Sequence, residues 1–505
     1  MSSCGSGFNL HPRRCAFRSL AIHDSTRPPD ATSPESPAAD DAGNAAAAAP
    51  LMLSVSGMRG LVGRSITPTV VARYAAAFGS WLKTDRDTPH PAVVLGRDSR
   101  PSGPMYQAAA AAGLTSVGCR VIRVGVLSTP GVAIMGQHLH ADGGMVITAS
   151  HNPAPWNGLK PLRHDGVAPP PDDVADIIDR FHADRADHVG VDQLQPITDH
   201  AGGVEVHRDL VAALVDVDAI RRAKLKAVVD SVHGAGGEEA AALLDHLGVQ
   251  RIHLYRQPTG RFPHVPEPTR ENLTELCDTV ARESAHVGFA QDPDADRLAI
   301  VDETGRYIGE EYTLALCALH KLQAGDTAVA NLSTSRMIDD LAAAANARVV
   351  RTPVGEANVA QGMRDHQSDL GGEGNGGIIW RPVSQVRDSL IGMAFILEML
   401  AQRQTPLSQL VRETPAYAII KDKLELARRE LADPALQWVA QHYAHQTVDT
   451  QDGVRVDWPD RWVHVRPSNT EPILRIIAEA ATPDAAQELI DTVRHGITKH
   501  AAPDV

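Results

Sequence analysis

The sequence contains few cysteines and lacks any long apolar run. Its five cysteines are odd in number and scattered over 505 residues, without CxxC pairs or other metal-ligand spacing. This argues against a disulfide framework and predicts reduced thiols. No stretch of about 18 apolar residues is present to span a bilayer, and the first 30 residues lack the uninterrupted apolar segment of a signal peptide. These absences predict a cytoplasmic protein that does not enter the membrane.

Positive charge is also in deficit. The 48 lysines and arginines are outnumbered by 62 acidic residues, and the formal net charge is -14. Because such a field repels polyanions, neither nucleic acid nor an anionic membrane surface is expected as a partner. An anionic small substrate must therefore meet a local basic pocket.

What is present is the composition of a folded enzyme. Hydrophobic residues make up 43% of the chain and charged residues 22%, as in globular proteins. A chain of 505 residues is too long for one hydrophobic core. We therefore expect roughly two to four packed domains, with room for a deep cleft between them.

The first segment differs in composition from the rest. Residues 1–50 are rich in Ser, Pro, Asp and Ala and show no apolar period, which predicts a disordered leader. Met52 stands immediately before the first patterned segment, and our hypothesis is that translation naturally begins there. Peptides from before Met52 in mass spectra of the native protein would contradict it.

Beyond the leader, a unit of strand, helix and strand occurs three times, at 92–124, 226–255 and 327–352. Short β-branched runs flank segments with Ala and Leu at helical spacing, the pattern of open sheets with helices on both faces. From about residue 415 two strands precede a helix opened by Thr482. The predicted class is α/β, with three successive similar α/β domains plus a smaller α+β C-terminal domain. The expected boundaries are 51–197, 198–308, 309–412 and 413–505.

The first candidate motif is Thr148-Ala149-Ser150-His151-Asn152-Pro153, which follows an apolar run and precedes Asn157-Gly158-Leu159-Lys160. Ligands bind at strand ends in α/β folds, and a serine held there on a turn exposes its hydroxyl to a cleft. Taken alone, the motif is explained at least as well by an ordinary turn capped by Ser and Asn.

The second motif is Asp292-Pro293-Asp294-Ala295-Asp296-Arg297, again after an apolar segment. Three carboxylates at alternate positions can converge on a hard cation such as Mg²⁺. The alternative is a solvated acidic turn. The adjacent arginine weakens that alternative, because a guanidinium suits a phosphate oxygen.

The third motif runs from Gly371 to Gly377 and contains five glycines. Glycines let the backbone approach a ligand closely, while Glu373 and Asn375 offer oxygens to sugar hydroxyls. A flexible surface hairpin has the same composition.

The fourth motif is Arg466-Pro467-Ser468-Asn469-Thr470-Glu471-Pro472, with Arg475 close behind. Guanidiniums and small hydroxyl or amide side chains around a turn form an anion nest that can hold a phosphate monoester. A capped loop between strands is an equal alternative when this motif stands alone.

In this order and at domain-sized intervals, the four motifs resemble those of the α-D-phosphohexomutase superfamily, from Met52 to near the C-terminus. The resemblance implies four domains around a central cleft, each contributing one motif. It also implies an isomerase-class intramolecular phosphotransferase that interconverts hexose 1-phosphate and hexose 6-phosphate. The reaction would pass through a phosphoserine enzyme and a hexose 1,6-bisphosphate, which would also act as activator.

The resemblance carries roles over to matching residues. Ser150 would hold the transferable phosphoryl group and, with the three aspartates, would ligate Mg²⁺. Arg297 would contact the phosphoryl group, with Lys160 and Arg59 as helpers near Ser150. The base for the attacking sugar hydroxyl is expected to be Lys160 first and His151 second. The metal ligands are therefore expected to be Ser150, Asp292, Asp294 and Asp296.

Sugar and distal phosphate would be bound by the third and fourth motifs. Glu373 and Asn375 would contact sugar hydroxyls. The expected phosphate ligands are Arg466, Ser468, Asn469, Thr470 and Arg475.

The third motif departs from the commoner wording of the superfamily. Asn375 and Gly377 stand where many members have Ser and His, so a histidine proposed for proton transfer is absent. The wording resembles an archaeal-type group of phosphoglucosamine and phosphomanno/phosphoglucomutases. We therefore expect glucosamine phosphate as substrate, with mannose and glucose phosphates as alternatives. A sugar phosphatase or a non-catalytic sugar-phosphate sensor is disfavoured, because the distal-phosphate motif, Ser150 and the aspartates are all present.

Overall fold

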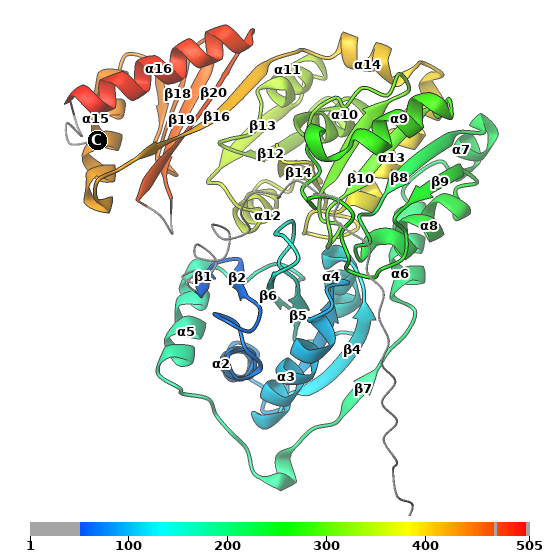
Figure 1. The fold of residues 1–505 in the computed structure, drawn as a ribbon, viewed down its shortest axis with the longest axis vertical. Helices are drawn as coiled ribbons and strands as arrows, with labels where there is room; N and C mark the ends of the chain where they lie inside the picture. The colour runs from blue at the N-terminus through cyan, green and yellow to red at the C-terminus, as the bar shows by residue number, and fades with distance from the viewer. Residues whose placement is uncertain (1–50, 469–471, 501–505) are drawn as a thin grey trace, which may run out of the picture. The chain divides into compact units, whose positions relative to one another are not determined.

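The computed structural model describes residues 51–468 and 472–500. Within the compact unit Ala48–Val505, four β-sheets follow one another along the chain (Figure 1). Three sheets mix parallel and antiparallel strands, and the fourth is wholly antiparallel, which confirms the predicted fold class. In the described ranges, the helices are all too short or too polar to cross a membrane.

Domain I is built on a seven-stranded sheet of order β1-β2-β6-β5-β3-β4-β7. β3, β4, β5 and β7 are parallel, while β6, β2 and β1 add antiparallel at one side. Because β7 pairs with β4, this sheet continues past the expected boundary at 197 to Asp199. The strands are β1 (Met52–Ser54), β2 (Gly57–Leu61), β3 (Ala92–Arg97), β4 (Arg120–Val126), β5 (Gly143–Ile147), β6 (Trp156–Arg163) and β7 (Ile197–Asp199). The helices are α2 (Pro68–Asp85), α3 (Gly103–Ser116), α4 (Thr129–His138) and α5 (Pro171–His182).

Domain II has a four-stranded sheet of order β11-β10-β8-β9. β9, β8 and β10 are parallel, and β11 returns antiparallel to β10. Its strands are β8 (Lys226–Asp230), β9 (Gln250–Leu254), β10 (Val287–Gln291) and β11 (Leu298–Asp302). The helices between domain I and β11 are α6 (Gly203–Ala212), α7 (Val217–Ala223), α8 (Gly236–His246) and α9 (Thr274–Arg282).

Domain III repeats this arrangement with the order β13-β12-β14-β15. Its strands are β12 (Thr327–Asn331), β13 (Arg348–Thr352), β14 (Leu370–Glu373) and β15 (Gly377–Trp380). Its helices are α10 (Glu311–Lys321), α11 (Met337–Ala344), α12 (Glu356–Asp365), α13 (Ser389–Arg403) and α14 (Leu407–Glu413). The three strand-helix-strand units predicted from the sequence are confirmed to within a few residues.

The same hairpin carries a candidate motif in each of these domains. The first motif fills the turn between β5 and β6, the second the turn between β10 and β11, and the third the turn between β14 and β15. In every case the first strand of the hairpin is parallel to its inner neighbour. The shared topology therefore places the three motifs at equivalent positions of three sheets.

Domain IV is a five-stranded antiparallel sheet of order β16-β20-β19-β18-β17. Helices α15 (Ala432–His442) and α16 (Pro483–His500) pack against one face through apolar side chains such as Val465 and Ile476. Of the fourth motif, Arg466 and Pro467 end β19, and β20 begins directly after Pro472. The strands are β16 (Ala418–Glu425), β17 (Thr447–Asp449), β18 (Val454–Asp457), β19 (Trp462–Pro467) and β20 (Ile473–Ala480).

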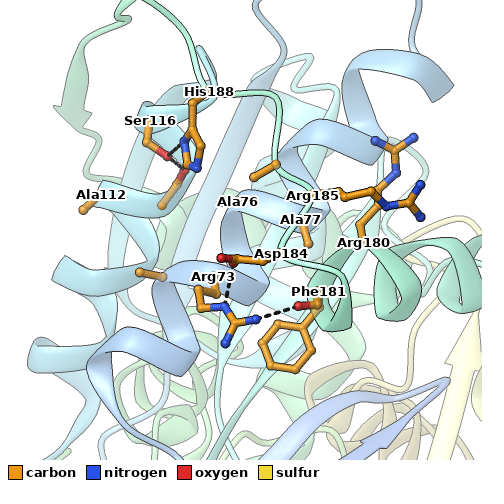
Figure 2. A pocket seen from close by; sticks show the side chains of 13 residues that line it. Arg73, Ala76, Ala77, Ala112, Ser116, Arg180, Phe181, Asp184, Arg185 and His188 are labelled. Carbon is orange, nitrogen blue, oxygen red and sulfur yellow. Dashed lines mark hydrogen bonds and ion pairs between the residues drawn. The ribbon is translucent and has the colours of Figure 1, made fainter.

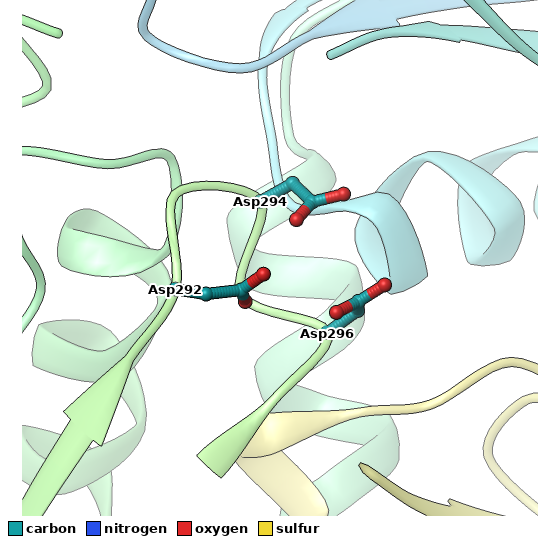
Figure 3. Close-up of side chains that lie close together, drawn as sticks. All are labelled: Asp292, Asp294 and Asp296. Carbon is teal, nitrogen blue, oxygen red and sulfur yellow. The ribbon is translucent and has the colours of Figure 1, made fainter. Parts of the chain in front are cut away.

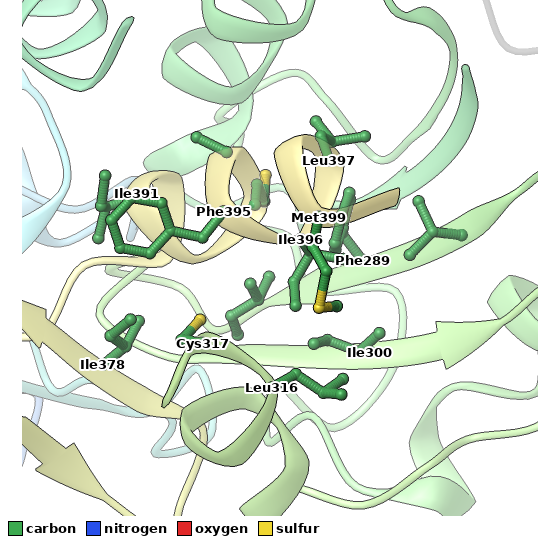
Figure 4. Close-up of a cluster of buried hydrophobic side chains, with 14 of the residues drawn as sticks. Phe289, Ile300, Leu316, Cys317, Ile378, Ile391, Phe395, Ile396, Leu397 and Met399 are labelled. Atoms are coloured by element: carbon green, nitrogen blue, oxygen red, sulfur yellow. The ribbon is translucent and has the colours of Figure 1, made fainter. Parts of the chain in front are cut away.

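Domains II and III share one hydrophobic core around α13. This helix is apolar on all sides, and its residues from 389 to 401 are buried, as expected of a helix enclosed by other elements. Ile391 and Phe395 belong to one cluster with Phe289 and Ile300 of domain II and Leu316 of domain III (Figure 4). The second and third motifs are therefore held by a common core.

We expect Phe395→Ala to lower the free energy of unfolding by about 3–5 kcal/mol, because it deletes a fully buried ring that the shared core cannot refill. Chemical denaturation monitored by circular dichroism would measure the change. Met105→Ala is the matched control, since Met105 is 44% exposed and its loss should change the free energy by less than about 0.5 kcal/mol. Equal effects of both variants would contradict the central role of α13.

Candidate active site

Ser150 lies on a turn that directs its hydroxyl toward domain II. Its φ of +51° is left-handed, and its backbone N–H donates to Thr148 Oγ1 at 2.9 Å. The side chain is 2% exposed. Ser150 Oγ donates to Asp292 Oδ2 at 3.1 Å and lies 3.3 Å from His151 Nδ1. The first and second motifs are therefore in direct contact, although 142 positions separate these residues.

A buried arginine fixes the backbone of this turn. Arg100 is fully buried, and its Nε donates to Asp98 Oδ2 at 3.0 Å. The ring of Phe262, from domain II, lies 5.0 Å from the guanidinium carbon. The two Nη atoms donate to four carbonyl oxygens of the turn, those of Ser150, Asn152, Pro153 and Trp156. No sequence motif displays these contacts, because the four acceptors are backbone atoms.

The three aspartates of the second motif converge on one point. Figure 3 shows Asp292, Asp294 and Asp296 projecting from the single loop between β10 and β11. Each is at most 1% exposed, and one oxygen of each lies within 4.8 Å of the others. Asp294 Oδ1 and Asp296 Oδ1 are buried without a hydrogen-bond partner. Buried, unpartnered carboxylate oxygens are the ligands that a hard cation such as Mg²⁺ takes, so this donor set fits the ion.

Two cations partly balance this negative charge. Lys160 Nζ donates to Asp294 Oδ2 at 2.6 Å and to Asp296 Oδ2 at 3.1 Å, and Arg387 Nη2 donates to Asp296 Oδ2 at 2.7 Å. Burial opposes ionisation of Asp296, but Arg387 and Lys160 hold its pKa below the ordinary range. Burial, with repulsion from Asp296 and Asp294, instead raises the pKa of Asp292 well above its ordinary value. Ionisation of all three carboxylates at once is therefore unfavourable without a further cation.

A cavity of about 390 Å³ is lined by His151, the neighbour of Ser150, and by Arg297, the neighbour of Asp296; Ser150 and the three aspartates lie behind this lining. Its walls combine cationic groups with carboxylates, as a phosphorylated sugar requires. Arg59 also donates to Asn152 Oδ1 at 3.2 Å. The predicted residues that line it are Arg59, His151, Lys160, Arg297 and Glu373.

His151 and Lys160 have opposite electrostatic environments in this cavity. Burial, followed by the charges of Arg297 and Arg59, lowers the pKa of His151 to about 3, so its imidazole is neutral at neutral pH. Burial also opposes the charge of Lys160, but Asp294 and Asp296 raise its pKa above the ordinary value. The imidazole can accept a proton as found, whereas the ammonium must first lose one.

The third motif presents Glu373 to the cavity and keeps Asn375 behind it. Glu373 Oε1 accepts hydrogen bonds from Asn331 Nδ2 at 2.8 Å and from Gly355 N at 3.1 Å. Asn375 Nδ2 lies 3.4 Å from Glu373 Oε2, and Asn375 is not among the residues that line the cavity. Asn375 therefore reaches a ligand in this cavity only through Glu373.

Arg387 is the residue that sequence reasoning missed. Its guanidinium is 11% exposed and bonds Asp296, Glu356 and Glu373 at 2.6–2.9 Å. A Cβ on Gly377 would lie 2.1 Å from Arg387 Cδ, so glycine at that position makes room for the arginine. The expected purpose of the glycines, close approach to a ligand, is thus only part of the explanation. The sequence carries no signal for this role, since Asp296 and Glu356 lie 91 and 31 positions away from Arg387.

The fourth motif places cations on the face of the domain IV sheet opposite its helices. Arg466 and Arg475 are paired across β19 and β20, and Arg475 is paired with Lys423 of β16. Directly paired residues share a face. Arg466 Nη2 lies 3.2 Å from Asp452 Oδ2, which also accepts from the backbone of Val354 on the cavity wall.

Not all predicted residues of this motif can be placed. Ser468 is buried, and its backbone N–H donates to Ile473 O at 3.0 Å. Asn469 and Thr470 lie outside the described residues. The described residues that line the 390 Å³ cavity come from domains I, II and III. Arg466 is linked to its wall through Asp452, which accepts from the backbone N–H of Val354.

A second cavity, of about 230 Å³, lies in domain I between α2, α3 and the segment after α5 (Figure 2). Five of its lining residues are alanines, and two of its three arginines form ion pairs. Arg73 donates to Asp184 Oδ1 and to the carbonyl oxygen of Phe181, and Arg180 pairs with Asp176. None of the four motifs contributes to this cavity, and we do not assign the chemistry to it.

Domain architecture and site together define a phosphotransferase with a buried serine beside an acidic cation site. Family profiles match the whole patterned chain. Profiles described as phosphoglucomutase/phosphomannomutase alpha/beta/alpha domains I, II and III match residues 52–188, 205–305 and 310–417. The C-terminal domain profile matches residues 426–496. The chain belongs to the phosphoglucomutase/phosphomannomutase family, whose members are intramolecular phosphotransferases of the isomerase class.

Relatives cover nearly the same span. A phosphoglucomutase/phosphomannomutase of Thermococcus kodakarensis is 36% identical over 443 residues, 86% of this chain and 96% of that protein. A probable phosphoglucosamine mutase of Methanopyrus kandleri is 35% identical over 442 residues, 86% of this chain and 95% of that protein. Relatives that are named for different sugars are therefore about equally similar to this chain in sequence.

Solved structures share the fold. A phosphoglucomutase/phosphomannomutase family protein of Burkholderia thailandensis superposes with a TM-score of 0.77 at 27% identity, covering 89% of this chain and 98% of that one. Aspergillus fumigatus N-acetylphosphoglucosamine mutase, solved with GlcNAc-6P and magnesium, has a TM-score of 0.53 at 14% identity over 85% of this chain and 96% of its own. At 14% identity, the similarity to the Aspergillus fumigatus enzyme concerns the fold alone.

Proposed function

We propose that this chain interconverts hexose 1-phosphate and hexose 6-phosphate through a phosphorylated Ser150 and a hexose 1,6-bisphosphate. The observation that carries the proposal is the contact of Ser150 Oγ with Asp292 at 3.1 Å, beside two buried carboxylate oxygens without partners. Arg59 and Arg297 line the same cavity. A hydroxyl at a cation site, surrounded by guanidiniums, is equipped to exchange a phosphoryl group.

In the first half-reaction, the bond between phosphorus and Ser150 Oγ breaks while a bond forms to the free hydroxyl of the sugar phosphate. The proton of that hydroxyl passes to a base, for which Lys160 and His151 are the two candidates because both line the cavity. The resulting bisphosphate turns around and returns its other phosphoryl group to Ser150. The same bisphosphate, supplied from outside, would load an unphosphorylated enzyme and so act as activator.

We assign the metal to Asp292, Asp294, Asp296 and an oxygen of the phosphoryl group on Ser150. Mg²⁺ bound there would draw negative charge from the phosphoryl group as it transfers. Arg297 is suited to the same group, because its side chain lines the cavity and its buried Nε has no partner among the described residues. The protein side chains thus leave one face of the site open for a phosphate.

The distal phosphate is assigned to domain IV, with Arg466 and Arg475 as its cationic ligands and Ser468, Asn469 and Thr470 as neutral ones. Support comes from the shared sheet face of the two arginines and from the buried Arg466 Nε, which has no partner among the described residues. Because the two ends of the substrate exchange places during the reaction, this site must hold a phosphate on either carbon.

We expect Arg466→Ala to raise KM roughly 10- to 100-fold in both reaction directions, because the substrate phosphate loses one charged hydrogen-bonding partner. The phosphoserine content should not change. Steady-state kinetics in both directions would measure this. Arg461→Ala is the control, because Arg461 lies in the same domain, is 41% exposed and forms an ion pair with the exposed Asp460. An unaltered KM for every sugar phosphate would place the distal phosphate elsewhere.

Glucosamine phosphate is the proposed preferred sugar, with glucose and mannose phosphates as the alternatives. Two carboxylates, Glu356 and Glu373, line the cavity. They favour a sugar with an ammonium group over one with only hydroxyls. A coupled assay with catalytic amounts of the matching bisphosphate would compare kcat/KM for the three sugars. A higher kcat/KM for mannose or glucose phosphate would overturn the proposed preference for glucosamine phosphate. The proposed type of reaction would still hold.

A further inference from the structure

A charged histidine is buried between domains, away from the cavity. His207 of α6 is fully buried, with Nδ1 2.9 Å from Glu239 Oε1 and Nε2 2.8 Å from Asp388 Oδ2. An imidazole can donate to two carboxylates at once only when both nitrogens are protonated. Burial opposes that charge, but Asp388 and Glu239 together raise the pKa of His207 to about 10. His207 is therefore an imidazolium cation at neutral pH.

One partner of His207 leads to the aspartate loop. Glu239, on α8, accepts hydrogen bonds from both the backbone N and the Oγ of Ser128 at 2.8 Å. The next residue, Thr129, donates its backbone N–H to Asp294 O at 2.9 Å and its Oγ1 to Asp294 Oδ2 at 2.7 Å. The position of Ser128 thus fixes a residue that directly holds a proposed metal ligand.

The other partner leads to the sugar side of the cavity. Asp388 caps α13, because its Oδ1 accepts from Leu390 N at 2.8 Å, and its own N–H donates to Ile378 O at 2.8 Å. The preceding residue is Arg387, which bonds both Asp296 and Glu373. Moving Asp388 would therefore displace the guanidinium that joins the second and third motifs.

We propose that His207 is a positioning residue that closes a ring of contacts behind the active site. From Asp294 the ring passes through Thr129, Ser128 and Glu239 to His207, and returns through Asp388 and Arg387 to Asp296 of the same loop. It links domains I, II and III. Thr129 and Arg387 line the cavity, whereas His207, Glu239 and Asp388 do not. Its role in turnover rests on the proposed mutase function, whereas its role in holding the metal ligands does not.

A second buried histidine offers a matched control. His320 Nε2 lies 2.7 Å from Glu398 Oε2, with side chains 8% and 7% exposed. Neither residue belongs to the four motifs or to the described lining of the 390 Å³ cavity. Loss of this pair should affect the stability of domain III and leave the active site alone.

The test compares His207→Gln, Asp388→Asn and His320→Gln in the full-length protein. Asn keeps an oxygen that can cap α13 while removing the charge that holds His207. We expect both His207→Gln and Asp388→Asn to weaken Mg²⁺ binding, measured by calorimetry, and to lower kcat, each by roughly 10- to 100-fold. His320→Gln should lower the melting temperature about as much as the other two variants do. It should leave the Mg²⁺ affinity and kcat within about twofold of the wild-type values.

Unchanged Mg²⁺ affinity and kcat in both folded variants would overturn the positioning role. The same holds if His320→Gln matched their losses, because that pattern reports general destabilisation. Should His207→Gln fail to fold, Asp388→Asn decides the outcome alone. If wild-type protein showed no mutase turnover, the proposed function would fail, and the Mg²⁺ affinities would still test the ring.

Discussion

Ser150→Ala should reduce mutase turnover by roughly three or more orders of magnitude, because it removes the only group proposed to carry the phosphoryl group. The fold should survive. The turn is held by backbone contacts, namely the carbonyl oxygens bonded by Arg100 and the N–H bonded to Thr148. Steady-state turnover and circular dichroism would measure the two properties.

Ser102→Ala is the control for this variant, since Ser102 Oγ accepts from Asn157 Nδ2 at 2.8 Å, whereas Ser150 Oγ donates to Asp292 of the aspartate loop. It should keep most of the turnover. Intact mass spectrometry should show a phosphorylated fraction in wild type and in the control, and none in Ser150→Ala. Near-normal turnover of the alanine variant would refute the covalent mechanism.

Asp294→Asn should cut turnover by roughly two or more orders of magnitude and weaken Mg²⁺ binding, because a neutral amide is a poorer ligand for a hard cation than a carboxylate. Removing metal with EDTA should have the same effect, reversed by added Mg²⁺. Asp294 also accepts hydrogen bonds from Lys160 and Thr129, and losing these bonds could lower turnover by itself. The Mg²⁺ affinity, measured by calorimetry, is therefore the direct test of the metal-ligand role.

The control for Asp294 is Asp302→Asn. Asp302 is also fully buried and lies at the end of the same β-hairpin, where it accepts from Thr304 and Arg306. Its loss should lower the melting temperature without changing Mg²⁺ affinity. Full activity of metal-free protein in EDTA would show that the aspartate loop serves another purpose.

Much of the architecture was predictable because it depends on local pattern. The repeated strand-helix-strand units follow from short apolar runs and Ala-rich helical segments, such as Ala92–Arg97 before Gly103–Ser116. The first two motifs stand directly after apolar runs. Parallel strands bring such positions to one edge of a sheet, so Ser150 and the aspartates could be assigned to strand ends before their contact was known.

The residues that sequence reasoning missed act through contacts that the chain order does not reveal. Arg100 holds carbonyl oxygens, which have no sequence signature. Arg387 reaches Asp296 over 91 positions and Asp388 reaches His207 over 181. The five glycines of the third motif were assigned to the ligand, but Gly374 and Gly377 lie against Glu311 and Arg387. The glycine pattern indicates that a neighbouring group comes close to the backbone, but it does not show whether that group is a ligand or another side chain.

The central claim is that Ser150 carries the phosphoryl group between two sugar positions. The most direct measurement loads the enzyme with hexose 1,6-bisphosphate labelled in its phosphoryl groups, maps the label by peptide mass spectrometry, and then adds unlabelled glucosamine 6-phosphate. We predict label on Ser150 after loading and its transfer to the sugar in the chase. Label that never appears on Ser150, or that leaves as inorganic phosphate at the rate of the chase, would contradict the claim.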